Sequence, residues 1–468
     1  MRFNLTDTIA AIATPAGTSA LSIIRVSGSN AISIVSSIFS EKDKLSNASG
    51  YQAVHGYIVD SEDIIDEVMC LVYRNPQSYT SEDMVEISGH GNPDLCNRIL
   101  QLLLKQCRMA EPGEFTFRAF MNHKLDLAQA EAVSDLIHAQ TAKAEISALN
   151  QLKGNLSNEI SNIIKELTDS RIQFELSIDF SDQDLPELGL DKVTEKLEQS
   201  YNKLKELYQN GRQGKMLRDG FTVCLSGAPN VGKSSVFNKF LEQNRAIVTP
   251  EPGTTRDYLE EWLSLDGYPV KLIDTAGLRT TKNQVEKIGI ERTKELISSA
   301  DMTIYLTDPD TLNKDLADNT LIYDSKTICV LNKVDLLNFD SLPDSQIWKE
   351  YLSGTKFGFV PKSKVKIYPC STYFAEGINA LKEQIIARIS LPDTQLSSIL
   401  VTNTRHLAAI EKAIESLSKA LQAISDFAGY EFIAFDLIEA VSSLSEITGA
   451  VTTDDMLDRI FSSFCIGK

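Results

Sequence analysis

The stretch Gly227-Ala-Pro-Asn-Val-Gly-Lys-Ser-Ser235 decides the fold of the central part of the chain. It follows an apolar run, Phe221 to Leu225, and precedes a run of helical character, Val236 to Leu241. A strand, a glycine-rich loop and a helix in this order predict a phosphate-binding loop. In such a loop the backbone amides point at the anion and the lysine reaches the β- and γ-phosphates. The predicted nucleotide-binding residues here are Asn230, Val231, Gly232, Lys233, Ser234 and Ser235, with Lys233 catalytic and Ser234 a Mg²⁺ ligand.

Three further segments follow in the order expected of a nucleotide-binding domain. Gly253-Thr-Thr-Arg-Asp257 is a polar segment whose threonines could close on Mg²⁺ and the γ-phosphate. Asp274-Thr-Ala-Gly277 ends an apolar strand; its aspartate would hold the metal through water, and the Gly277 amide would sense the terminal phosphate. Asn332-Lys-Val-Asp335 follows another apolar strand-like run. Its aspartate can accept hydrogen bonds from the N–H groups at N1 and N2 of guanine, and adenine has no donors at these positions. The predicted ligand is therefore GTP, bound by Gly253, Thr254, Thr255, Asp274, Thr275, Ala276, Gly277, Asn332, Lys333 and Asp335.

The position after the Asp274–Gly277 box departs from the Ras-like pattern. Ras-like GTPases place a water-orienting glutamine there, whereas this chain has Leu278. Hydrolysis therefore needs another polar group, and Arg256, Arg279 and Glu286 are the nearby candidates. Asn230 has two readings from the residues alone. It can help to coordinate a monovalent cation beside the phosphates, or it can bond its own backbone as loop asparagines do.

Composition narrows the class of protein. A chain of 468 residues predicts about three domains. The seven cysteines are scattered, odd in number and without a Cys-x-x-Cys pair, which predicts reduced thiols in the cytoplasm and no zinc site or disulfide framework. The sequence has no 18-residue apolar span and no signal-peptide pattern, so we expect neither membrane insertion nor secretion.

The net charge bears on nucleic-acid partners. A formal charge of −18 argues against a sequence-independent grip on nucleic acid, so no DNA partner is expected. Any contact with RNA should be local, or shared with a more basic partner.

Patterning along the chain predicts a multidomain α+β and α/β protein. Residues 1–118 alternate short strands, expected at Leu21–Val26, Val54–Val59 and Glu67–Tyr73, with turns and helices, as in an α+β domain. Residues 119–215 carry long helical stripes, with a basic bend expected at Gly211-Arg-Gln-Gly214. Residues 216–388 form the Ras-like G domain, and the helical pattern returns in residues 389–468. The sequence therefore predicts one discontinuous helical domain into which the P-loop domain is inserted.

Several segments outside the nucleotide boxes resemble the MnmE (TrmE) family of tRNA-modification GTPases. The resemblance covers nearly the whole chain. The matching segments are Asp7-Thr-Ile-Ala10, Ala13-Thr-Pro15, His90-Gly91, Pro112-Gly-Glu-Phe115, Lys124-Leu-Asp-Leu-Ala-Gln-Ala-Glu131 and Phe464-Cys-Ile-Gly-Lys468. The last segment discriminates best, because ribosome-assembly GTPases resemble this chain in the nucleotide boxes but not in this tail. A regulatory GTPase of ribosome assembly without folate chemistry remains the alternative.

The resemblance implies a function and a set of partners. Such proteins use a tetrahydrofolate one-carbon unit, as 5-formyl- or 5,10-methylene-tetrahydrofolate, to modify C5 of the wobble uridine in certain tRNAs. The product carries an aminomethyl or carboxymethylaminomethyl group. The partner is a flavoprotein, MnmG (GidA), in a heterotetramer-type complex. The family is homodimeric through its N-terminal domain, and potassium-driven dimerisation of the G domains stimulates GTP hydrolysis.

The resemblance also assigns roles to residues around the nucleotide. Asn230, Thr249, Glu251 and Thr254 match potassium-binding positions, and Ser234 and Thr255 match the Mg²⁺ ligands. Glu286 matches the catalytic acid that orients the attacking water. Two departures from the family pattern concern this site. The potassium loop contains Pro250 and Pro252 before Gly253, and the guanine-supporting box reads Ser371-Thr-Tyr, so that guanine selection depends more on Asp335.

In the N-terminal domain the resemblance implies a folate site. Arg25, Glu86 and Lys124 match folate-binding positions, and Lys468 matches a tail lysine that reaches the same pocket. A carboxylate can accept hydrogen bonds from the N–H groups of the pterin ring of a folate. Cations can pair with the carboxylates of the folate's glutamate tail. Cys465 is a site candidate with two readings. It can be a nucleophile if its pKa is lowered, or a small apolar residue among its aromatic neighbours.

Overall fold

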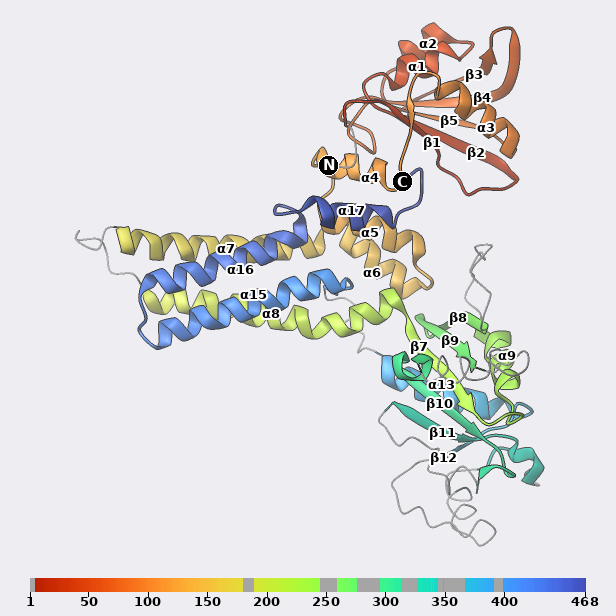
Figure 1. Cartoon of the computed structure of the whole chain (residues 1–468), viewed down its shortest axis with the longest axis vertical. Coiled ribbons are helices and arrows are strands. Elements are labelled where there is room, and N and C mark those ends of the chain that lie inside the picture. Colours follow the sequence, from red (N-terminus) through yellow and green to blue (C-terminus); the bar gives the residue numbers. More distant parts are fainter. Residues whose placement is uncertain are drawn as a thin grey trace, which may run out of the picture. The chain divides into compact units, whose positions relative to one another are not determined.

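The computed structural model describes residues 5–179, 189–244, 259–275, 295–312, 326–337, 339, 341–343, 348, 367–390 and 399–468. The chain divides into two compact units (Figure 1). The first unit comprises Met1–Ser134, Gln151–Asn202 and Ala409–Lys468. The second comprises Asp135–Asn150 and Lys203–Ala408.

The first unit contains a six-stranded, mainly antiparallel sheet in the order β3-β4-β5-β2-β1-β6. Its core lies between one face of the sheet and the helices, where alternate strand residues such as Val26, Cys70 and Ile87 are buried. The strands predicted near Leu21, Val54 and Glu67 are confirmed. The bounds are β1 Ile9–Ile12, β2 Ser19–Ser27, β3 Gln52–Asp60, β4 Asp63–Tyr73, β5 Met84–Gly91, β6 Arg108–Met109, α1 Ala31–Ser37, α2 Lys42–Ser46 and α3 Pro93–Leu103.

Register across this sheet brings two predicted site residues together. Strands β2 and β5 pair antiparallel with Arg25 directly opposite Glu86. Directly opposed residues project from the same face of a sheet. This face is the one away from α1 and α3, because the neighbouring Ile24, Val26 and Ile87 point into the core with those helices.

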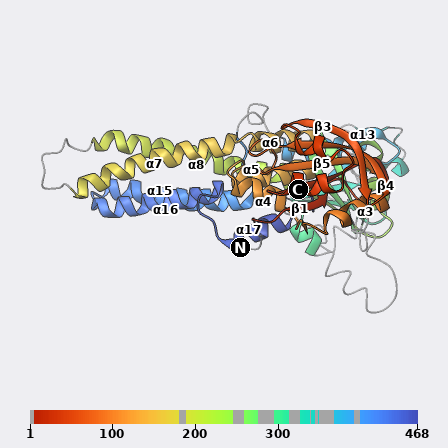
Figure 2. The same cartoon turned by 90° about the horizontal axis from the view of Figure 1, so that it is seen from above.

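Helices complete the first unit. Helix α7 (Asn155–Asp179) lies beside α16 (Tyr430–Thr448) in both Figure 1 and Figure 2, with the rings of Phe174 and Tyr430 5.5 Å apart. Helix α17 (Asp454–Ser462) packs on α4 (Glu114–Met121), where the rings of Phe117 and Phe461 are 5.2 Å apart. Helix α5 (Leu127–His138) adds Leu127, Ala130 and Val133 to the same core.

The second unit contains a six-stranded sheet in the order β12-β11-β10-β7-β9-β8. All neighbouring strands are parallel except β8, which runs antiparallel to β9. The carboxyl ends of parallel strands meet at one edge, where α/β sheets bind ligands. The bounds are β7 Phe221–Gly227, β8 Leu259–Leu265, β9 Tyr268–Asp274, β10 Met302–Thr307, β11 Thr327–Leu331, β12 Ile367–Pro369, α6 Ala142–Leu152, α9 Lys233–Asn244, η2 Val334–Leu337 and α13 Ala375–Ile389.

The predicted bend at Gly211–Gly214 is wrong. Helix α8 runs without interruption from Leu190 to Asp219. The two glycines instead permit close packing on α15 (Thr404–Ser425) and on the segment just before it. A Cβ atom at position 211 would lie 1.9 Å from Leu407 Cδ2, and one at position 214 would lie 2.3 Å from the Val401 carbonyl oxygen. Glycine inside a helix costs about 1 kcal/mol relative to alanine, and here it removes a clash.

The observed elements confirm the predicted fold class. An α+β sheet domain comes first, helices follow, a P-loop α/β sheet comes next, and helices return towards the C-terminus. The domain boundaries at residues 118, 215 and 388 stay predictions. Within the described residues, no helix combines the length and apolarity needed to span a membrane.

Candidate functional site

The phosphate-binding loop lies between the end of β7 at Gly227 and the start of α9 at Lys233. The backbone conformation at both ends of the loop requires glycine. Gly227 has φ +137° and Gly232 has φ +94°, values that residues with a side chain rarely adopt. A Cβ atom on Gly227 would lie 2.0 Å from the carbonyl oxygen of Leu306 in β10. The strand, loop and helix predicted from the sequence are therefore confirmed.

Lys233 and Ser234 begin the helix that follows this loop. The Lys233 Nζ donates to the carbonyl oxygens of Gly227 and Ala228, at 2.9 and 2.7 Å, so its ammonium lies over the loop. Ser234 Oγ donates to Asp274 Oδ2 at 2.9 Å. Asp274 is fully buried at the end of β9, beside Thr275, whose hydroxyl donates to the Leu225 carbonyl at 2.8 Å. Neighbouring hydroxyl and carboxylate oxygens are the kind of donor set that suits Mg²⁺.

The predicted guanine-binding residues are joined to the phosphate loop through Asn332. Its Nδ2 donates to the Val231 carbonyl oxygen at 2.8 Å. Asp335, three residues on, accepts a hydrogen bond from Ser371 Oγ, and that hydroxyl accepts from the Tyr373 amide at 3.2 Å. The structure therefore brings together the loop, Asp274 and the Asn332–Asp335 box, and Ser371 lies beside Asp335.

The other predicted nucleotide and cation residues lie outside the described residues. They are Thr249, Pro250, Glu251, Pro252, Gly253, Thr254, Thr255, Ala276, Gly277 and Glu286. Their roles stay predictions. Asn230 is described: it is exposed in the loop with φ +65°, a conformation that asparagine tolerates better than most residues. Either reading of its side chain remains open.

Asp308 is a site residue that sequence reasoning missed. It follows β10, and its Oδ2 pairs with Lys333 Nζ at 2.8 Å. The amide and hydroxyl of Thr311 donate to its Oδ1 at 3.0 and 2.9 Å. Burial opposes ionisation of Asp308, but the hydrogen bonds from Lys333 and Thr311 outweigh it and lower its pKa. The only signal in the sequence is an aspartate after an apolar strand.

We expect Asp308→Ala to weaken GTP binding by about 10-fold. Without its anchor, the long Lys333 side chain must be ordered when nucleotide binds, which costs about 0.5–1.5 kcal/mol. Asp308→Asn, which keeps an oxygen acceptor, should lose less. Fluorescent-GDP titration measures the effect, and Asp310→Ala, two residues along the same loop, is the matched control. Equal affinities for Asp308→Ala and the control would show that Lys333 needs no anchor.

In the first unit, Arg25 and Glu86 form an ion pair on the open face of the sheet. Arg25 Nη2 and Nε lie 2.7 and 3.0 Å from Glu86 Oε1. Tyr73 OH donates to Glu86 Oε2 at 3.0 Å, and burial together with the Glu86 charge raises the pKa of Tyr73 to about 12. The two charged side chains are only 13% and 17% exposed, so the pair is strengthened by partial exclusion of water.

Aromatic rings and the C-terminal tail surround this pair. The Arg25 guanidinium lies 5.3 Å from the centre of the Tyr79 ring and 5.5 Å from that of Phe115, within cation–π range. Arg25 Nη1 also donates to the Gly467 carbonyl oxygen at 3.2 Å. Burial and the nearby Arg25 charge lower the pKa of Lys468, while Glu86 partly offsets this effect. Arg25 therefore joins Glu86 to the C-terminal tail next to Lys468, although the three residues come from distant segments.

Lys124 and Cys465 contact segments that neighbour Arg25: Lys124 the loop that carries Tyr79, and Cys465 the turn before Phe115. Lys124 Nζ donates to the carbonyl oxygen of Ser78, the residue before Tyr79, and burial lowers its pKa. Cys465 is exposed, and its carbonyl oxygen accepts from the Gly113 amide at 3.4 Å. Neither reading of the Cys465 thiol is decided by this position.

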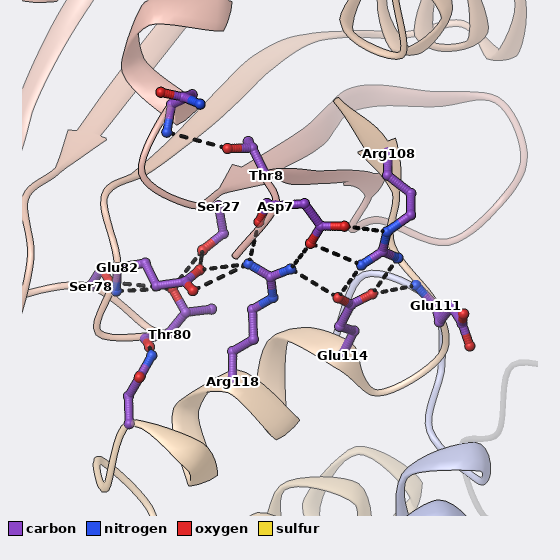
Figure 3. A network of polar contacts seen from close by, with 12 residues as sticks. Asp7, Thr8, Ser27, Ser78, Thr80, Glu82, Arg108, Glu111, Glu114 and Arg118 are labelled. Atoms are coloured by element: carbon purple, nitrogen blue, oxygen red, sulfur yellow. Dashed lines mark hydrogen bonds and ion pairs between the residues drawn. The ribbon is translucent and has the colours of Figure 1, made fainter. Parts of the chain in front are cut away.

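A charged network that the sequence did not reveal lies beside the elements that carry Phe115 and Tyr79 (Figure 3). Arg118 is fully buried on α4 and pairs with Asp7, Glu82 and Glu114 at 2.9, 3.2 and 3.0 Å. Glu82 also accepts from Ser27 Oγ at 2.8 Å, which ties the loop carrying Tyr79 to β2. A buried arginine cannot be told from a surface arginine in a single sequence. The network fixes the helix and loop that supply Phe115 and Tyr79.

The second unit defines the class of protein. A parallel sheet carries the phosphate loop, a buried aspartate after β9 and an Asn-Lys-x-Asp box at its ligand-binding edge. These features together define a P-loop GTPase domain.

Comparison with known proteins identifies the family. Residues 8–124 match the family model "GTP-binding protein TrmE N-terminus", and residues 127–465 match "MnmE helical domain". The chain is 40% identical to the tRNA modification GTPase MnmE of Alkaliphilus metalliredigens, over 99% of this chain and 100% of the relative. It is 39% identical to those of Alkaliphilus oremlandii and Clostridioides difficile, over 99% of each chain. The chain belongs to the MnmE family of tRNA modification GTPases.

Proposed function

We propose that this GTP hydrolase works with the flavoprotein MnmG to modify C5 of the wobble uridine in certain tRNAs. It installs an aminomethyl or carboxymethylaminomethyl group from a tetrahydrofolate one-carbon unit, in the cytoplasm, as a homodimer within a heterotetramer-type complex. The observation that supports this most is that Arg25 joins Glu86 to the tail residue next to Lys468, in a chain that also carries a GTPase site. A regulatory GTPase has no need of that charged group.

The GTPase site supplies binding and charge neutralisation. The loop amides and Lys233 bind the β- and γ-phosphates, and Asp335 selects guanine. Ser234 and Thr255 would hold Mg²⁺, with Asp274 behind Ser234 at 2.9 Å. Bound Mg²⁺ neutralises charge on the phosphate oxygens. Asn230, Thr249, Glu251 and Thr254 would bind K⁺, and Glu286 would orient the attacking water.

GTP hydrolysis is expected to be about 10-fold or more faster in K⁺ than in Na⁺. The oxygen ligands of the proposed cation site set its size and coordination number, and these differ between the two ions. Turnover is measured at equal ionic strength in the two chlorides. Asn230→Ala should remove most of the difference, because its amide oxygen is one of the proposed ligands. Equal rates in both salts for the wild-type protein would remove the potassium mechanism and leave Asn230 as an ordinary loop residue.

The pocket of the first unit has the chemistry that a reduced folate needs. Glu86 can accept hydrogen bonds from pterin N–H groups, Arg25 and Lys468 can pair with the glutamate carboxylates, and Lys124 lies near the Tyr79 loop. The Tyr79 and Phe115 rings add apolar surface beside Arg25. Either 5-formyl- or 5,10-methylene-tetrahydrofolate fits this donor set. The bound folate supplies the one-carbon unit.

We expect Arg25→Gln and Glu86→Gln each to weaken binding of 5-formyltetrahydrofolate by about 10- to 100-fold, the usual loss for one charge-assisted hydrogen bond in a partly buried site. Isothermal titration calorimetry measures the affinity. Lys44→Gln, which removes an exposed cation of the same unit, is the control. Unchanged affinity in both variants would mean that the folate binds elsewhere or not at all.

The proposed function as a whole is tested by mass spectrometry of wobble nucleosides from cells with and without this protein. Loss of the C5-modified uridine on deletion, and recovery with the wild-type gene but not with Glu86→Gln, is the expected result. Normal nucleosides together with a defect in ribosome assembly would favour the regulatory alternative.

A further inference from the structure

The connection between α15 and α16 exposes an unusual group of aromatic side chains. Phe427, in the turn between the helices, is 94% exposed, and Phe432 and Phe435 on α16 are 67% and 61% exposed. Ile438, one turn further along α16, is 40% exposed. Single exposed apolar residues are common on protein surfaces, but four within twelve positions of one helical hairpin are not. We call these four residues the hairpin patch.

The other side of α16 already has its partner. Ile433, Leu437 and Leu444 are buried, and α16 packs along α7 in both views of the chain. The contact between the Phe174 and Tyr430 rings brings the end of α7 to the start of α16. A helix that is apolar on both sides is expected to be covered on both sides. The hairpin patch therefore has the character of an interface that a single chain does not cover.

The stretch of sequence that carries the hairpin patch is acidic. Between Lys419 and Arg459 the chain has no lysine, arginine or histidine, and it has eight acidic residues: Asp426, Glu431, Asp436, Glu439, Glu446, Asp454, Asp455 and Asp458. The first four of them interleave with the aromatic residues of the patch. Burial raises the pKa of Asp436, and the neighbouring Glu439 adds to this effect, while Lys419 opposes it. Cations from outside the chain would relieve this crowding.

Exposed aromatic side chains next to acidic residues limit the kinds of molecule that can cover the hairpin patch. An RNA backbone or an anionic membrane would be repelled by the acidic residues. A second copy of the same chain, with its net charge of −18, would place identical acidic faces against each other. A protein that offers an apolar pocket edged by lysine or arginine satisfies both the aromatic residues and the charge.

The proposed function supplies such a protein. A chain of charge −18 is poorly suited to a sequence-independent grip on the tRNA backbone, so we expect a more basic component of the complex to share that contact. We infer that the hairpin patch is the docking surface for the flavoprotein partner, with Phe432 and Phe435 as anchors and the surrounding acids as partners for its cations. This inference rests on the proposed two-protein function.

The test uses the full chain and purified MnmG from the same organism. The double variant Phe432→Gln/Phe435→Gln removes the anchors with a residue that favours helix. Truncating two central aromatic anchors should lower the affinity by about 100-fold or more, which corresponds to about 2.7 kcal/mol. Ile64→Gln, at a 65% exposed apolar residue of the first unit, is the matched control and should bind as the wild type does. A second variant, Glu431→Lys/Glu439→Lys, should slow association and flatten its dependence on salt.

Each outcome bears on a different part of the inference. Loss of affinity in both double variants, with the control and GTP hydrolysis by the chain alone unchanged, supports the docking surface. Wild-type affinity in Phe432→Gln/Phe435→Gln overturns the docking surface and leaves the proposed function intact. Failure of the wild-type chain to bind MnmG at all overturns the two-protein function itself. A shift of the double variant from dimer to monomer in analytical ultracentrifugation, with MnmG binding unchanged, would instead assign the patch to a second copy.

Discussion

Asp335→Asn is expected to invert the base preference of the GTPase site. The Asp335 carboxylate can accept hydrogen bonds from both N1–H and the N2 amino group of guanine. Asparagine offers one acceptor and one donor, a pattern that matches xanthine, whose C2 carries an oxygen. A site built around hydrogen bonds to a ligand rejects an analogue with mismatched groups by about 10³-fold or more. Competition titrations with GTP and XTP measure the two affinities.

Substitution of Ser371, which contacts Asp335, is expected to have a smaller effect than Asp335→Asn and serves as the comparison for it. Its hydroxyl donates to Asp335 Oδ1, and it lies fully buried beside the carboxylate. Ser371→Ala should therefore weaken GTP binding by only about 10-fold, the loss of one hydrogen bond to a charged group. Its preference for GTP over XTP should be retained. An Asp335→Asn protein that still prefers GTP would show that guanine is recognised by other groups.

Glu286→Ala is expected to slow GTP turnover by about 100-fold or more while GTP affinity changes by less than about 3-fold. A group that orients the attacking water acts in the transition state and contributes little to ground-state binding. Leu278 occupies the position where Ras-like proteins have their glutamine, so no compensation is available from that residue. Single-turnover hydrolysis and nucleotide titration separate the two effects.

Glu286→Gln is the informative control, since a glutamine can also orient water and should recover part of the rate. If Glu286→Ala hydrolyses GTP at the wild-type rate, Arg256 and Arg279 become the next candidates. Either of them would act by stabilising charge on the phosphate oxygens rather than by positioning water.

Local sequence patterns predicted much of the fold. The strands around Leu21, Val54 and Glu67, the phosphate loop and the helices near the C-terminus each have a periodicity or a motif that depends on neighbours in the sequence. The described part of the GTPase site was predictable for the same reason: the phosphate loop, Asp274 and the Asn332–Asp335 box each lie at the end of a strand, and parallel strands bring their ends to one edge. The pocket around Arg25 and Glu86 was predictable only through the family resemblance.

What the sequence could not predict depends on contacts between distant segments. Gly211 and Gly214 look like a bend, yet they serve close packing against Val401 and Leu407. Arg118 looks like any charged surface residue until Asp7, Glu82 and Glu114 are seen around it. In each of these cases the deciding partner is far away along the chain, where periodicity carries no information.

The contact between Arg25 and the Gly467 carbonyl joins residues 442 positions apart, with the whole GTPase domain between them in the chain. Translation adds about 5–20 residues each second, so the sheet that holds Arg25 leaves the ribosome tens of seconds before Gly467 is made. During that interval the nascent N-terminal domain has its sheet but not its tail. The pocket is therefore among the last features to mature during biosynthesis, and a truncated translation product would lack it even where its sheet had folded.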